Sequence, residues 1–270
     1  MDTSTWVPDE SLVDKPNAAR IYDHLLGGYH NFEVDRLAVE RLIAADPNVR
    51  MATWVNRAFL RRCVQFLAEQ GIDQFLDIGS GIPTVGNVHE IAQAANPSAR
   101  VVYVDIDPVA VAHSQAILRG NPSVAAIHAD ARQPEQILDH ADVRRLLDWS
   151  KPAAVLFVAV LHLLPDDHQA YHAVATLRDV SAAGSYVAIS HPSYEDASPA
   201  FLEQINKLTA VAPSRYQYRM LAKIERFFDG LDLVEPGLVH TPQWRPESPQ
   251  DLLLDEPKHA FCFAGVGLKP

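Results

Sequence analysis

The sequence predicts an α/β protein: a mostly parallel sheet with helices on both faces and a helical extension before it. From residue 74 onward, short apolar segments alternate with helical patterns, which is typical of parallel strands joined by helices. The segment 153–161 is almost entirely apolar, as expected of a central strand that is buried on both faces. Before residue 71 the apolar residues follow mainly helical spacing.

Three helices are expected in the N-terminal extension, residues 1–70. Asn17 is placed to cap the first helix, whose apolar residues recur at spacings of three and four, and Gly27-Gly28 is a natural stop. The second helix ends before Pro47, and a glycine closes the third. The expected helical ranges are 18–28, 33–46 and 51–71.

Strands and helices alternate through a second domain, residues 71–270. Pro108 is tolerated in the first turn of a helix and Gly120 is a natural stop, so they bound the helix after the second strand. The expected strands are 74–79, 100–107, 124–130, 152–160 and 184–191. The helices expected between them lie near 85–95 and at 108–120, 134–148 and 166–181.

The alternation ends at a helical insert that covers about residues 196–229. Two further strands are expected at 231–240 and 259–269, and Pro236-Gly237 interrupts the first of them. The loop between these strands is rich in proline and contains no helical pattern. The sequence therefore predicts an antiparallel pair at the end of the sheet.

Composition and charge narrow the class of protein. The chain carries a net charge of −11 and has no run of basic residues, so we expect no nucleic-acid partner. No apolar run approaches the roughly 20 residues that cross a bilayer, and the N-terminus lacks the features of a signal peptide. Cys63 and Cys262 form no C-x-x-C motif, which fits a cytoplasmic protein. The twelve histidines show no metal-binding spacing, so we expect no metal.

A glycine-rich turn follows the first strand, in the segment QFLDIGSGIPTVG (74–86). Gly79 and Gly81 allow the backbone to turn sharply and allow a ligand to approach main-chain N–H groups. Thr84 occupies the position where a dinucleotide-binding loop has its third glycine, and no arginine stands nearby to hold phosphate. Asp77 would repel a pyrophosphate, whereas it suits the cationic amino-acid end of S-adenosylmethionine (SAM). The loop therefore favours SAM over NAD.

Acidic residues also end the next two strands. Asp105 is placed to accept hydrogen bonds from both hydroxyls of a ribose, and Asp130 from an adenine amino group. Asp107 is as well placed to cap the next helix as to bind a ligand. Because the carboxyl ends of parallel strands meet at one edge of a sheet, these groups predict a site for an adenosine-containing cofactor.

Three motifs of the chain resemble motifs I, II and III of class I SAM-dependent methyltransferases: FLDIGSGIPT, VVYVDIDPVAV and IHADARQP. More narrowly, these segments together with NAARIYDHLLGGYHNFEVDR, AVLHLLPD and VEPGLVHTPQWRP resemble an actinobacterial methyltransferase family formerly catalogued as a domain of unknown function. The resemblance runs from about residue 15 to 269. It implies a Rossmann-like sheet of seven strands with the last strand antiparallel. The Ile-Pro-Thr variant of the glycine loop is shared by that family.

The resemblance also implies roles for individual residues at the cofactor. Gly79, Ser80 and Gly81 line the methionine end, and Ala159 and Val160 lie beside the sulfonium.

At the nucleoside end, the resemblance implies that Asp105 holds the ribose and that Ile106 packs on the adenine. Asp130 and Ala131 hold the edge of the adenine ring.

The first helix has two interpretations. It forms a lid whose Arg20 or Tyr22 reaches the cofactor carboxylate, or it is an amphipathic helix with a local Arg20–Asp23 pair.

Other side chains are candidates for contact with the methyl acceptor, although each is equally compatible with a structural role. They are His162, His191, Tyr194, Tyr29 and His30.

The lead hypothesis is a SAM-dependent methyltransferase that acts on a small molecule by in-line displacement, in which alignment supplies most of the catalysis. No nucleophile-and-base set stands out, so no catalytic residue is named and His162 is the first position to mutate. Two alternatives stay open: a non-catalytic protein that binds SAM or S-adenosylhomocysteine (SAH), and an NAD-dependent oxidoreductase. The acceptor, the atom methylated and the oligomeric state are not predicted.

Overall fold

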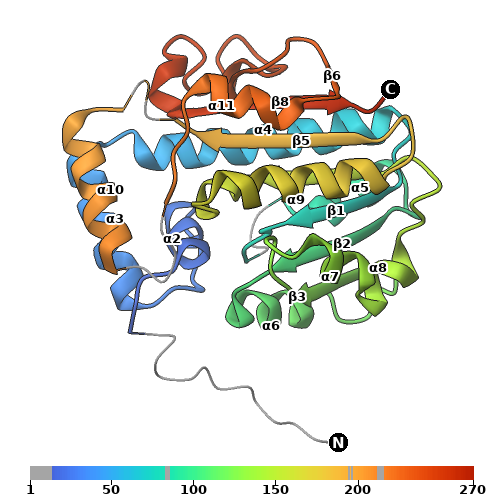
Figure 1. The fold of residues 1–270 in the computed structure, drawn as a ribbon. Coiled ribbons are helices and arrows are strands. Elements are labelled where there is room, and N and C mark those ends of the chain that lie inside the picture. Colours follow the sequence, from blue (N-terminus) through green and yellow to red (C-terminus); the bar gives the residue numbers. More distant parts are fainter. Residues whose placement is uncertain (1–13, 83–85, 194, 196, 212–215) are drawn as a thin grey trace, which may run out of the picture.

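The structure is a computed structural model that describes residues 14–82, 86–193, 195, 197–211 and 216–270. A central sheet lies between two layers of helices, and a group of helices covers one end of the sheet (Figure 1). The strand order is β3-β2-β1-β4-β5-β8-β6. This arrangement confirms the predicted α/β class with a mostly parallel sheet.

Five strands form the parallel part of the sheet. They are β1 (Gln74–Ile78), β2 (Arg100–Asp105), β3 (Val124–His128), β4 (Ala154–Val158) and β5 (Tyr186–Pro192). Their neighbours pair in parallel, so all five carboxyl ends meet at the same edge.

The last strands are antiparallel, as predicted. β8 (Cys262–Leu268) runs antiparallel to β5 along its whole length. The expected strand 231–240 forms only two short segments, β6 (Asp232–Leu233) and β7 (Val239–His240), and both pair antiparallel with β8. Because β5 occupies one side of β8, the two segments share its other side and together take the seventh position of the sheet. Pro236 and Gly237 lie in the interruption between them.

The two faces of the sheet are buried by different helices. On one face, Leu76 and Ile78 pack with α7 (Pro134–Asp139), α8 (Ala141–Leu146) and α9 (Asp167–Val180). On the other, Phe75 packs with α4 (Val49–Glu69) and α5 (Val88–Ala95). This alternation follows from the two-residue repeat of a strand. The segment 134–148, which was expected to form one helix, forms two short helices that meet at His140.

Helix caps predicted from the sequence are present. The Asn17 side chain accepts a hydrogen bond of 2.8 Å from the N–H of Ala19 and begins α2 (Ala18–Leu25). The Asp107 side chain accepts from the N–H of Val109 at 2.9 Å and begins α6 (Pro108–Ile117).

A third apolar cluster lies at the carboxyl ends of the strands, and we call its helices the cap. The cap consists of α2, α3 (Glu33–Ala45) and α10 (Pro199–Val211), whose buried side chains pack on one another. In Figure 1 the arrowhead of β5 points toward α10 and α3, and α2 lies between them and the strand ends. Although α4 was expected within the N-terminal extension, it packs on the sheet itself.

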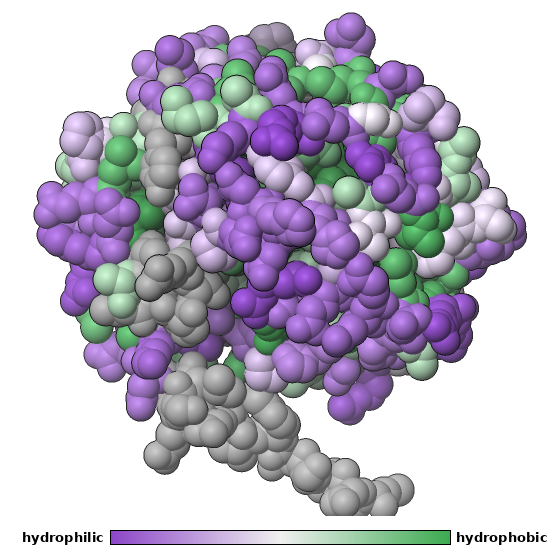
Figure 2. All heavy atoms as spheres, in the orientation of Figure 1, coloured by the Kyte–Doolittle hydropathy of each residue, from purple (hydrophilic) through white to green (hydrophobic). Residues whose placement is uncertain are grey.

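The outer surface is largely hydrophilic on the face that Figure 2 shows, with apolar side chains in small groups. Within the described ranges, no helix combines the length and apolar character needed to span a bilayer.

A buried arginine joins the end of the helical insert to the exit of β4. Arg219, which is 1% exposed, donates to the carbonyls of Leu161 at 2.9 Å and Leu164 at 2.8 Å. It also donates to Asp167 Oδ1 at 2.9 Å, and its Nη1 lies 3.0 Å from His191 Nε2. The loop after β4 therefore takes its shape from a side chain that follows it by more than fifty residues.

We expect Arg219→Ala to lower the free energy of unfolding by about 3–5 kcal/mol, because it leaves the buried carbonyls of Leu161 and Leu164 without their donor and removes the partner of His191 Nε2. The matched control is Lys223→Ala, since Lys223 pairs at the surface with the carboxylate that Arg219 also contacts and is worth less than about 1 kcal/mol. Urea denaturation measures both. Equal losses in the two variants would contradict the structural role assigned to Arg219.

Candidate functional site

A cavity of about 690 Å³ opens at the carboxyl ends of the parallel strands. Its lining combines the loops after β1, β2, β3 and β4 with residues of α4 and of all three cap helices. This volume lies within the roughly 300–1,000 Å³ typical of small-molecule sites. Every residue that the sequence predicted for cofactor binding lies on this lining: Arg20, Tyr22, Asp77, Gly79, Ser80, Gly81, Asp105, Ile106, Asp130, Ala131, Ala159 and Val160.

The glycine turn after β1 is tightly packed against the loop after β4. Gly79 and Gly81 adopt positive φ angles of 69° and 63°. A Cβ atom at Gly79 would stand 2.1 Å from Val160 Cγ2, so no larger residue fits there. The N–H groups of Gly79 and Ser80 both donate to the carbonyl of Val104, which holds the turn beside β2. Pro83 and Thr84 lie outside the described residues.

The carboxylate of Asp105 links the end of β2 to the glycine turn. Its Oδ2 accepts from the N–H of Gly81 at 2.7 Å, and its Oδ1 accepts from the N–H of Asp107 at 2.8 Å. Burial raises the pKa of Asp105, although these N–H donors oppose the shift. One buried carboxylate therefore orients both the turn and the start of α6.

Asp77 is a second buried carboxyl on the same wall of the cavity. Burial raises its pKa to about 7, the charge of Arg57 opposes the rise, and Asp105 adds to it. Arg57 lies on α4 and also lines the cavity. Arg57 was not among the site residues predicted from the sequence, because its segment shows only the spacing of a helix.

The end of β3 carries a local ion pair. Asp130 accepts from the backbone N–H of Arg132 at 2.9 Å and from its Nε at 2.8 Å. Burial alone would raise the pKa of Asp130, but the hydrogen bonds and charge of Arg132 lower it overall. Nearby, Ile106 lines the cavity with 52% of its surface exposed, which offers an apolar ledge to a flat ligand.

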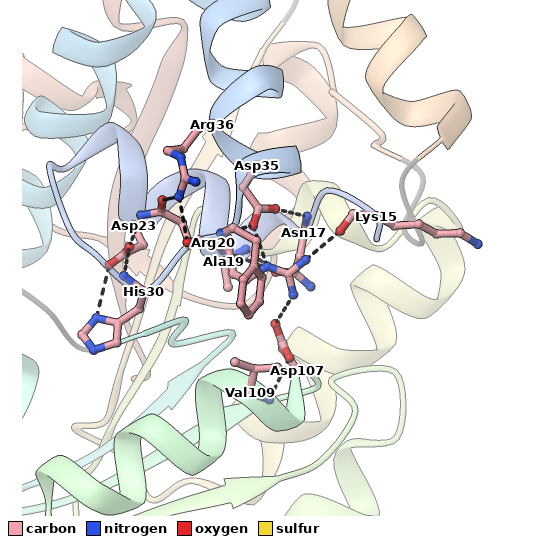
Figure 3. A network of polar contacts seen from close by, with 12 residues as sticks. Lys15, Asn17, Ala19, Arg20, Asp23, His30, Asp35, Arg36, Asp107 and Val109 are labelled. Atoms are coloured by element: carbon pink, nitrogen blue, oxygen red, sulfur yellow. Dashed lines mark hydrogen bonds and ion pairs between the residues drawn. The ribbon is translucent and has the colours of Figure 1, made fainter. Parts of the chain in front are cut away.

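Arg20 does not form the pair with Asp23 that one interpretation expected. Its Nε donates to Asp35 Oδ2 at 2.8 Å, and its Nη2 donates to the carbonyl of Lys15 at 2.6 Å. Its Nη1 lies 3.8 Å from Asp107 Oδ2, an ion-pair distance (Figure 3). The Arg20–Asp23 expectation was wrong because the helical spacing that suggested it cannot reveal partners from α3 and from the cap of α6.

The Asp23 carboxylate instead holds the turn that follows α2. Its Oδ2 accepts from the backbone N–H of His30 at 2.8 Å and from the side-chain amide of Asn31 at 2.9 Å. The ring of His30 packs edge-on against His113 of α6, with ring centroids 4.5 Å apart.

A chain of buried polar groups runs from α2 to the loop after β4. The amide of Asn56 donates to the hydroxyl of Tyr22 at 2.9 Å, and Ser190 Oγ donates to Asn56 Oδ1 at 2.6 Å. Ser190 Oγ in turn accepts from the N–H of Ala159 at 3.0 Å. Ala159 has a positive φ of 53°, which is uncommon for a residue with a Cβ atom. Sequence reasoning missed Asn56, although it is a polar residue on the buried stripe of α4.

His162 lies on the cavity wall, just after Ala159 and Val160. Its ring stacks on Tyr216 with centroids 5.6 Å apart, and Tyr218 lies at 5.8 Å. Burial lowers the pKa of His162 to about 3, with a further contribution from Arg219, so the ring is neutral near pH 7. Its Nδ1 is buried and has no hydrogen-bond partner among the described residues.

Three other candidate acceptor residues, His191, Tyr29 and His30, do not line this cavity. His191 is fully buried, with Nδ1 at 2.7 Å from the carbonyl of Pro192 and Nε2 facing Arg219, so both ring nitrogens are engaged. Burial lowers its pKa well below the usual value. Tyr29 is 94% exposed, and His30 packs on His113. Tyr194 lies outside the described residues. Among the residues that are described, no cluster of three or more acidic, histidine or cysteine side chains could hold a metal ion.

Comparison with known proteins identifies the family. A sequence profile described as S-adenosyl methyltransferase matches residues 4–270. The structure is similar to that of a candidate methyltransferase from Thermobifida fusca, with 43% identity, a TM-score of 0.90, and 98% of this chain and 99% of that one covered. It is also similar to a DUF574 family protein from Streptomyces avermitilis, with 35% identity, a TM-score of 0.89, and coverage of 96% and 99%.

More distant structures agree in fold alone. The N-methyltransferase NodS from Bradyrhizobium japonicum, solved with SAH, is 14% identical with a TM-score of 0.51, over 93% of this chain and 99% of that one. Among curated proteins, none matches the chain at a significant level. The family match and the two similar actinobacterial structures confirm the resemblance found in the sequence. The chain belongs to the S-adenosyl methyltransferase family, and its cofactor is S-adenosylmethionine.

Proposed function

We propose that this protein is an enzyme that transfers a methyl group from SAM to a small-molecule acceptor inside the cavity. The observation that supports the proposal is the composition of the cavity wall, which joins the strand-end residues to the side chains of the cap. An acceptor roofed by α2, α3 and α10 has to be small enough to lie beneath them. The alternative of an NAD-dependent oxidoreductase is not supported, because the chain belongs to a family that uses SAM.

The residues at the strand ends fit SAM. Gly79 has no room for a side chain because Val160 fills the space beside it, which keeps the glycine turn against the loop after β4. A neighbouring carboxyl at Asp77 suits the ammonium group of SAM. Asp105 presents a buried carboxylate to ribose hydroxyls, and the exposed Ile106 offers an apolar surface to adenine. When bound, SAM supplies an electrophilic methyl group on a sulfonium.

Alignment and exclusion of water are the main contributions that we assign to the chain. The loop after β4 is held by Ser190 and Arg219, so the wall beside the reacting region keeps one shape. His162, with a pKa of about 3, is too weak a base to remove a proton readily. We therefore do not assign His162 as a general base.

The setting of the enzyme is also proposed. Two free, buried cysteines, Cys63 and Cys262, suit a reducing cytoplasm. The net charge of −11 disfavours nucleic acid as the acceptor.

Incubation of the purified protein with methyl-labelled SAM and fractionated small-molecule extracts tests the function. We expect the label to move to a compound of low molecular mass, and SAH to appear in equal amount. Binding of SAM without transfer to any fraction would contradict catalysis and favour the non-catalytic binding protein.

The substitution Asp105→Ala should weaken SAH binding by about tenfold to a hundredfold, because the ribose hydroxyls lose a charged acceptor. Asp105→Asn keeps one oxygen and should lose less. Isothermal titration calorimetry measures both, and Asp139→Ala, at an exposed carboxylate that pairs with Arg144, is the control. Unchanged affinity in Asp105→Ala, with the thermal midpoint retained, would show that the carboxylate does not hold the nucleoside.

Cofactor affinity should also depend on the ionisation of Asp77. Its pKa is raised to about 7, so the carboxyl is mostly protonated below that pH and mostly ionised above it. The ionised form attracts the ammonium group, and SAH should therefore bind up to about tenfold more tightly at pH about 8 than at pH about 6. Titration calorimetry at both pH values measures the difference. The matched variant Asp77→Asn should lose this dependence, and an equal dependence in it would refute the assignment.

A further inference from the structure

The cavity has a half that is distinct in chemistry from the strand ends, and we call it the apolar half. Its walls come from α10, from the segment 216–218 of the insert and from the loop after β4. The residues that define it are His162, Phe201, Ile205, Leu208, Tyr216 and Tyr218. Phe201, Ile205 and Leu208 pack in the cap cluster, and both tyrosines lie against that cluster. The ring of His162 stacks on Tyr216, so the six side chains form one continuous wall.

The apolar half adjoins the end of the cofactor site that the sequence assigned to the sulfonium. His162 follows Val160 by two positions, and Val160 Cγ2 lies against the backbone of Gly79. An acceptor in the apolar half therefore has its reacting atom beside the glycine turn.

No charged side chain faces this half among the described lining residues. The acidic and basic residues of the lining belong to the strand ends, to α4 and to the segment 15–20. Arg219 lies behind His162, but it is buried and paired with Asp167 and two carbonyls, and it does not line the cavity. A charged acceptor that entered this half would lose its hydration and gain no partner of opposite charge. Its desolvation would therefore cost several kcal/mol.

His162 brings an imidazole to this wall, beside the hydroxyl groups of Tyr216 and Tyr218. The imidazole is neutral, so one of its nitrogens donates a hydrogen bond and the other accepts one. Its Nδ1 has no partner among the described residues, although buried polar atoms are almost always paired in native proteins. The aromatic rings of Tyr216 and Phe201 on this wall favour an aromatic ligand, because aromatic rings pack favourably on one another.

We propose, building on the methyltransferase function above, that the acceptor is an uncharged, mainly aromatic molecule with a hydroxyl group that hydrogen-bonds to His162. The apolar half binds the ring system, and His162 positions the hydroxyl at the boundary with the cofactor site. His162 acts here as a binding and positioning residue.

Three naphthalene derivatives with the same ring system and a small substituent test the charge requirement: naphthol, naphthoate and naphthylmethylammonium. Each is titrated by calorimetry into the full chain, once with saturating SAH and once without it. We expect naphthol to bind at least about tenfold more tightly than either charged probe. The inference is overturned if a charged probe binds as tightly as naphthol, or if no probe binds. The function itself fails separately, if SAH does not bind.

The role of His162 is tested with a second pair of ligands, naphthol and naphthalene. His162→Phe keeps a flat ring but removes the hydrogen bond, so naphthol should bind about fivefold more weakly while naphthalene changes by less than about twofold. Equal losses for both ligands would show that the residue acts only by packing.

Two substitutions on α10 complete the design. Phe201→Ala removes part of the apolar wall and should weaken both naphthol and naphthalene. Lys207→Ala lies on the exposed side of the same helix, where Lys207 pairs with Glu203, and should weaken neither. If Lys207→Ala weakens binding as much as Phe201→Ala, the probes do not bind in the apolar half and the inference is wrong.

Discussion

The buried guanidinium of Arg20 is the contact on which the arrangement of the site depends. It connects α2 to Asp35 of α3, to the carbonyl of Lys15 and to Asp107, the cap of α6. Asp35 is fully buried and also accepts from the N–H groups of Asn17 and Phe32, so its charge is well satisfied. Because a buried charge that loses its partner is strongly destabilising, α2 and α3 either dock on the strand end together or leave two charges unpaired.

The chain of polar contacts that begins at Tyr22 connects α2 to a second wall of the cavity, the loop after β4. Tyr22 contacts Asn56, Asn56 contacts Ser190, and Ser190 holds the N–H of Ala159. The same α2 helix thus connects to the cap of α6 through Arg20 and to the loop after β4 through Tyr22. A change in the position of α2 would disturb both walls at once. This coupling gives the N-terminal helices a role in shaping the site as well as covering it.

Prediction from the sequence succeeded where the determinant is local. The alternating strands, the caps at Asn17 and Asp107 and the positive φ of Gly79 all follow from residue type and spacing. The strand-end carboxylates could be grouped because parallel strands present their carboxyl ends at one edge. The partners of Arg20 and the burial of His191 could not be predicted, because each depends on segments far apart in the sequence that meet only in the folded chain.

Apolar burial and hydrogen bonding both hold the cap on the sheet, and they contribute in different ways. The apolar cluster of α2, α3 and α10 contributes burial, which is large but has no preferred direction, so it alone would allow the helices to slide. The polar chains through Arg20 and Tyr22 contribute little net energy, yet each hydrogen bond forms at one geometry only. These hydrogen bonds fix the position of α2, because they form well at one position of the helix and poorly when it is shifted. The proposed function requires this fixed position, because the cavity would have to place a methyl acceptor within reach of a sulfonium and alignment is the contribution to catalysis that we assign to the chain.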